Sequence, residues 1–162
     1  MRRDPIDATD ARLLLALTAD PRATVVSLAE SAGVSRNTVQ ARLARFDALR
    51  VLGPIDARID PAALGYPLTA FIDVRVTQRL LRAVAAALAG IPEVIEVIGL
   101  SNETDLLARV VARDADDLYR VAGRILSTAG VERTQTSLAM RRLVDYRIGP
   151  LLERIAGRRP RS

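Results

Sequence analysis

The sequence contains no cysteine and no histidine among its 162 residues. Disulfide bonds, metal sites built from thiolate or imidazole ligands, and Ser-His-Asp catalysis are therefore excluded. Apolar runs such as Val94 to Leu100 are far shorter than the roughly 20 residues of a membrane-spanning helix, and the N-terminus carries no apolar signal core. We expect a cytoplasmic protein that does not enter a membrane, needs no cofactor or metal, and is not an enzyme.

Lysine is absent as well, so all 24 basic residues are arginine, and the formal net charge is +5. A basic chain favours a polyanionic partner, and the arginine fork matches phosphate groups and guanine edges. The same composition is also typical of a GC-rich genome, so charge alone does not identify the partner. The excess charge lies in residues 141–162, which form either a DNA-contacting or a simply solvated tail.

Helical segments are expected in the first part of the chain. Asp7 caps a helix with leucines along one stripe, and Asp20-Pro21 ends it because the residue before proline disfavours helical backbone. Thr24 caps a short second helix. Gly33 follows it and supplies the left-handed backbone that a sharp turn needs.

A third helix begins after its cap residue, Ser35. Val39, Leu43 and Phe46 recur at i, i+4 and i+7, which predicts one buried face. Two short helices joined by a glycine turn form a helix-turn-helix, whose second helix enters the major groove of DNA. The segment therefore predicts binding to double-stranded DNA.

The polar side of this third helix offers the chemistry that reads base edges. Asn and Gln pair with adenine, Arg with guanine or phosphate, and Ala and the Thr methyl group contact thymine. A merely solvated helix would also be polar, but this one is the second helix of a tight turn. The candidate DNA-binding residues are Ser35, Arg36, Asn37, Thr38, Gln40, Ala41, Arg42 and Arg45.

A connection between two domains is expected after Leu49. Residues Val51 to Asp60 resemble a short extended ribbon, and Asp60-Pro61 and Gly65-Tyr66-Pro67 are breaks. The expected division is a helix-turn-helix domain at 1–50, a ribbon and linker at 51–67, a second domain at 68–145, and a short helix with an Arg-rich tail at 146–162.

The second domain has the order βαββαβ. Alternating apolar residues from Leu68 to Val76 predict a half-buried strand whose second face still carries Phe71. The expected later elements are a helix through Leu88, strands Val94 to Leu100 and Asp105 to Ala112, a helix Ala115 to Ser127, a strand Val131 to Leu143, and a helix Ile148 to Ala156. This order predicts a ferredoxin-like sheet with both helices of the domain on one face. The fold class is α+β, with an N-terminal winged helix-turn-helix.

These segments also resemble a known family. RATVVSLAESAGVS (Arg22 to Ser35), VQARLARF (Val39 to Phe46), VLGPIDARIDPAALG (Val51 to Gly65) and SNETDLL (Ser101 to Leu107) resemble the Lrp/AsnC (leucine-responsive, feast/famine) transcription regulators. Gly130-Val131 and Arg133 to Thr136 continue the similarity, which covers about residues 6 to 145. Each piece is loose, but their order is specific.

The resemblance implies dimers built through the C-terminal sheet, often assembled into octamers, with an amino acid bound between dimers near the hairpin. The ligand residues that it implies are Ser101, Asn102, Thr104 and Asp105, with Thr134 and Thr136 from the last strand. Asp105 would pair with the ligand's ammonium, and hairpin amides and hydroxyls with its carboxylate. Polar hairpin residues and strand threonines also commonly serve the turn and the sheet themselves.

Two residues depart from the family pattern. Arg50 stands where the family usually has Gly after the recognition helix, so a left-handed backbone there would be strained. Asn102 replaces the usual Gly of the hairpin, but Asn tolerates that conformation well.

Other functions stay open. A DNA-organising protein of the same architecture would differ only in lacking an effector, and an interaction module would have lost DNA binding. Siroheme decarboxylases resemble the same two-domain layout, but they are associated with active-site His, which this chain lacks. We expect a ligand-responsive homodimer or higher oligomer on a pseudo-palindromic operator.

Overall fold

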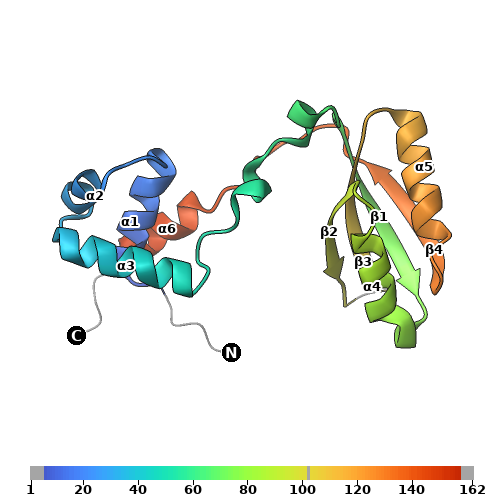
Figure 1. Ribbon diagram of the computed structural model, residues 1–162, viewed down its shortest axis with the longest axis horizontal. Helices are drawn as coiled ribbons and strands as arrows, with labels where there is room; N and C mark the ends of the chain where they lie inside the picture. The colour runs from blue at the N-terminus through green and yellow to red at the C-terminus, as the bar shows by residue number, and fades with distance from the viewer. Residues whose placement is uncertain (1–5, 102, 158–162) are drawn as a thin grey trace. The chain divides into compact units, whose positions relative to one another are not determined.

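A computed structural model describes residues 6–101 and 103–157. The chain forms two compact units (Figure 1). Unit one comprises the residues up to Ala57 together with those from Val144 onward, and unit two comprises Arg58–Leu143. The chain therefore leaves unit one, builds unit two, and returns to unit one. Within the described ranges, no helix is long and apolar enough to cross a membrane.

Unit one is helical, with α1 (Ala8–Ala19), α2 (Val25–Ala32), α3 (Arg36–Ala48) and α6 (Gly149–Ala156). The predicted caps are confirmed, because Asp7, Thr24 and Ser35 each accept a hydrogen bond from a backbone N–H in the first turn. Leu13, Leu28, Val39 and Phe46 lie at its centre, each at most 1% exposed. The apolar face predicted for the third helix is therefore the buried one.

Helix α6 is part of this unit. The sequence predicted a helix here but not its partner, and the structure packs it against α1. Leu152 is 7% exposed and belongs to the same core as Leu13 and Phe46, and Ile155 and Ala156 pack against that core. Helix α6 thus completes the core of the helix-turn-helix unit.

The predicted ribbon over Val51 to Asp60 is wrong. Residues 51–67 contain two 3₁₀ helices, η1 (Ile55–Arg58) and η2 (Pro61–Leu64), and no strand. Pro54 and Pro61 have no N–H to donate to a ladder, and the Asp60 side chain accepts from the Ala62 N–H to start η2. The wing expected from this segment is therefore not formed.

Unit two contains a four-stranded antiparallel sheet in the order β2-β3-β1-β4. Its strands are β1 (Leu68–Val76), β2 (Val94–Gly99), β3 (Leu106–Ala112) and β4 (Val131–Leu138). Turn η3 (Gln78–Leu80) leads into α4 (Leu81–Ala89), and α5 (Ala115–Leu126) joins β3 to β4. The predicted βαββαβ order is confirmed, although β4 ends at Leu138 rather than Leu143.

Both helices of unit two cover one face of the sheet (Figure 1). Ile72 and Val74 from that face are completely buried with Val84 of α4 and Val121 of α5. Alternate residues of each strand point to the other face, which we call the far face. Phe71, Asp73, Leu107 and Arg109 lie on it.

Candidate functional site

The turn between α2 and α3 positions the candidate recognition helix. Gly33 has a φ of 67°, and the Val34 N–H donates to the carbonyl of Ala29 at 3.0 Å, which closes a tight turn. The Ser35 hydroxyl accepts from the Thr38 N–H at 3.2 Å and contacts the Thr38 hydroxyl at 2.9 Å. Ser35 and Thr38 therefore begin α3, whatever they contribute to DNA contact.

One side of α3 is open to solvent. Its exposed stripe consists of Asn37, Gln40, Ala41 and Ala44, which we call the reading face, with exposed Arg36 beside it. Ala44 was not among the predicted residues, although its helical spacing from Asn37, Gln40 and Ala41 could have identified it. Amide groups for adenine and small side chains for close approach to thymine suit a major groove.

Arg42 and Arg45, which were also predicted to bind DNA, contact carboxylates at the start of α1. Arg42 Nη1 donates to Asp7 Oδ2 at 2.5 Å and to Asp10 Oδ1 at 2.8 Å, and Arg45 Nη1 donates to Asp10 Oδ2 at 2.7 Å. The Asp10 side chain is completely buried. These two arginines therefore join α3 to α1.

The same contacts shift the pKa values of Asp7 and Arg42. Partial burial alone would raise the pKa of Asp7, but hydrogen bonds from the Asp10 N–H and from Arg42 bring that pKa below its usual value. The hydrogen bond to Asp7 in turn raises the pKa of Arg42. Both groups stay charged near neutral pH.

In the predicted ligand site, the Asp105 carboxylate already has partners. Its Oδ2 accepts from the Val76 N–H at 2.8 Å, and its Oδ1 accepts from Gln78 Nε2 at 2.5 Å. The Asp105 backbone also accepts from the Leu100 N–H and donates to the carbonyl of Val74. Asp105 therefore ties the β2–β3 hairpin to the end of β1.

The other predicted ligand residues lie in two places. In the hairpin, Ser101 is exposed, Thr104 donates to Asp73 Oδ1 at 3.4 Å, and Asn102 lies outside the described residues. Thr134 and Thr136 lie on β4, opposite Val74 and Ile72 of β1. Because β1 separates β3 from β4, these threonines are about 10 Å from the start of β3 across the sheet. The two sets therefore lie on strands that are separated by β1.

The far face of the sheet is partly apolar. Phe71 is 38% exposed and Ile98 is 44% exposed, and both lie beside Leu107 or Arg109 in the strand register. Arg109 Nε is buried and has no hydrogen-bond partner among the residues that the structure describes. Exposed apolar side chains in neighbouring strands suit a partner surface that covers them.

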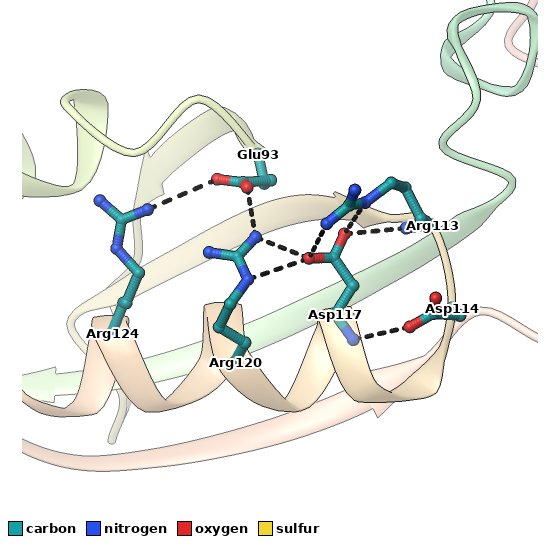
Figure 2. Close-up of polar contacts among 6 residues, drawn as sticks. All are labelled: Glu93, Arg113, Asp114, Asp117, Arg120 and Arg124. Carbon is teal, nitrogen blue, oxygen red and sulfur yellow. Dashed lines mark hydrogen bonds and ion pairs between the residues drawn. The ribbon is translucent and has the colours of Figure 1, made fainter.

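Sequence reasoning missed an ion-pair network on α5. Figure 2 shows Asp117 between Arg113 and Arg120, with Glu93 accepting from Arg120 at 2.5 Å and Arg124 at 3.9 Å from Glu93. Hydrogen bonds, first from Arg113 and then from Arg120, hold the pKa of Asp117 well below its usual value. The Arg120 hydrogen bond likewise lowers the pKa of Glu93. The i,i+4 and i,i+3 spacings around Asp117 were the available signal.

Comparisons with known proteins agree with both units. The AsnC-type helix-turn-helix domain matches residues 6–47, and the Lrp/AsnC ligand binding domain matches residues 69–148. The HTH-type transcriptional regulator AldR of Mycolicibacterium smegmatis is 33% identical over 147 residues, covering 88% of this chain and 86% of that protein.

Solved structures extend the similarity to the fold. E. coli AsnC aligns with a TM-score of 0.80 at 26% identity, over 91% of this chain and 100% of that one. The feast or famine regulatory protein from M. tuberculosis, complexed with L-methionine, aligns with a TM-score of 0.77 at 31% identity, over 88% and 97%. The chain belongs to the Lrp/AsnC family of transcription regulators, with an N-terminal helix-turn-helix and a C-terminal ligand-binding domain.

Proposed function

We propose that this regulator binds a specific double-stranded DNA sequence and that a small ligand, an amino acid, changes its assembly or its DNA affinity. The observation that carries the DNA part is the reading face of α3. Asn37 and Gln40 are exposed on the second helix of a helix-turn-helix, where bidentate contacts to adenine form. Arg36 is exposed beside them and suits a phosphate or a guanine.

The proposed assembly is a homodimer, and a higher oligomer such as an octamer. Support comes from the far face, where Phe71 and Ile98 are exposed beside Arg109 and Leu107 of β3. A second copy packed on this face would cover these apolar side chains. Two-fold symmetry of the recognition helices then calls for a pseudo-palindromic operator.

The proposed effector is an amino acid. A relative with the same fold is described in complex with L-methionine. The residues proposed to bind the effector here are Ser101, Thr104 and Asp105 at the β2–β3 hairpin and Thr134 and Thr136 on β4. An ionised carboxylate has about four acceptor sites, so Asp105 can serve both Gln78 and a ligand ammonium. The two sets lie on strands separated by β1, and in this proposal a second subunit completes the pocket around the ligand.

Selection from a random pool of duplexes tests the DNA part. We expect a two-fold symmetric sequence to be enriched, and Asn37→Ala to lose roughly 1 to 3 kcal/mol on it with little loss on scrambled DNA. A pool without enrichment would refute specific recognition and favour an interaction module.

A thermal-shift screen of the twenty amino acids tests the effector. We expect at least one amino acid to raise the melting temperature and to change affinity for the selected duplex. Asp105→Asn keeps the side-chain shape and should weaken the shift. Specific DNA binding without any amino acid response would identify an effector-independent DNA-organising protein.

A further inference from the structure

We infer that Asp10 is a positioning residue for DNA recognition, which holds the reading face in place through Arg42 and Arg45. These two arginines act as internal struts and not as DNA contacts. The inference rests on the proposed DNA-binding function and adds the residues that orient its recognition helix.

The geometry places one buried carboxylate at the junction of two helices. Asp10 lies in the first turn of α1, and its side chain is completely buried. Each of its oxygens accepts from a different arginine, at 2.8 Å from Arg42 and 2.7 Å from Arg45. Oδ2 also accepts from the Asp7 N–H at 3.1 Å, which completes the capping box of α1. The two arginine contacts connect α3 to α1, and the contact with the Asp7 N–H caps α1.

A buried carboxylate strongly constrains its surroundings. An ionised carboxylate removed from water needs partners, and losing one costs far more than a surface contact. Arg42 and Arg45 are three residues apart on α3, so they leave the helix on the same side. That side lies between the buried stripe of Val39 and Phe46 and the reading face. Two struts on one flank therefore limit rotation of α3 about its axis, which apolar packing alone limits less.

The contacts with Asp7 and Asp10 also determine how Arg42 and Arg45 contribute to the salt dependence of DNA binding. A phosphate contact releases counterions and adds about one unit to the slope of log affinity against log salt. Arg42 and Arg45 already face carboxylates, so their charge is compensated within the chain. Arg36 is exposed on the same helix. We therefore expect Arg36 to contribute to the salt slope and the two struts not to contribute.

The experiment uses the full chain with two probes, the enriched duplex described above and a duplex of scrambled sequence. Asp10→Asn should lower the preference for the enriched duplex at least tenfold while binding to scrambled DNA stays equal or rises. Glu30→Gln is the matched control, because Glu30 is exposed on α2 and its loss changes net charge by the same amount. It should leave the preference unchanged.

Arg45→Met tests the Arg45–Asp10 contact without changing a buried residue. It remains informative if Asp10→Asn lowers the melting temperature below the temperature of the binding assay. It should weaken binding to the enriched duplex without changing the salt slope, whereas Arg36→Met should lower the slope by about one unit. The double variant Asp10→Asn/Arg45→Met should lose no more preference than Asp10→Asn alone, since both act on one contact.

Two results would overturn the inference. One is a salt slope that falls by about one unit in both Arg42→Met and Arg45→Met, which would make them phosphate contacts. The other is additive loss in the double variant, which would separate Arg45 from Asp10. If the wild-type protein enriches no duplex at all, the proposed DNA recognition fails instead, so the two failures are distinguishable.

Discussion

The two units are built from the sequence in different ways. Unit two is one continuous stretch, Arg58–Leu143, and its core comes entirely from within that stretch. Unit one joins Leu13 and Phe46 to Leu152, which follows only after all of unit two. The unit with the reading face therefore depends on the far end of the chain, and the sheet unit depends only on itself.

The strongest test separates the units as fragments. Residues 58–143 keep the whole sheet core and should fold alone, with a cooperative thermal transition measured by circular dichroism. Residues 6–57 lack α6 and should not fold stably, because Leu13 and Phe46 lose the cover of Leu152 and Ile155. A cooperative transition in the 6–57 fragment would show that unit one folds without α6, and the proposed difference between the two units would be wrong.

A point substitution makes the same comparison in the intact chain. Leu152 is 7% exposed in the core of unit one, so Leu152→Ala should destabilise that unit by about 2 to 4 kcal/mol. Its neighbour Leu151 is 54% exposed, so Leu151→Ala should change stability by less than about 0.5 kcal/mol. Hydrogen exchange should show faster opening of α1 and α3 with unchanged protection of β1 and β3. Equal losses from both substitutions would contradict the packing of α6.

Local patterns explain why much of this fold was predictable from sequence. Val39, Leu43 and Phe46 identified the buried side of α3, and alternation from Leu68 to Val76 identified β1, because each signal lies within one element. The apolar side of α6 was equally readable, but its partner lies over 130 residues earlier, and periodicity does not name a partner.

The candidate sites show the same limit. Helical spacing put Arg42 and Arg45 on the polar flank of α3, yet the pairing with Asp10 spans 32 and 35 residues and could not be read from spacing. The predicted ribbon also required a second strand as partner, which periodicity does not identify, although Pro54 and Pro61 were local signals against such pairing.

Two glycines of unit two differ in the space that is available for a side chain. Gly130 has a φ of 95°, and a Cβ there would lie 2.9 Å from Leu80 Cδ1 and 3.1 Å from Val84 Cγ2. Gly130→Ala should therefore destabilise unit two by roughly 1 to 3 kcal/mol through strain and overpacking. Gly123, inside α5, has nothing within 4 Å, so Gly123→Ala should stabilise by about 0.5 to 1 kcal/mol. Thermal unfolding of the 58–143 fragment measures both changes in stability. A lower melting temperature of Gly123→Ala would contradict the open space at that position.

The smallest effect is expected at the C-terminal end of α3. Arg50 has a φ of 49°, the left-handed region that non-glycine residues avoid, so the strain predicted from the family's usual glycine is present. Arg50→Gly removes this strain, and after the extra chain entropy of glycine is subtracted it should stabilise unit one by about 0.5 to 1 kcal/mol. Ala44, exposed and inside α3, is the control, because Ala44→Gly should instead cost about 0.5 to 1 kcal/mol. Chemical denaturation of the intact chain, followed by a signal from unit one, gives both signs in one experiment. If both glycine substitutions lower the free energy of unfolding equally, Arg50 does not hold the left-handed conformation, and the expected relief of strain is refuted.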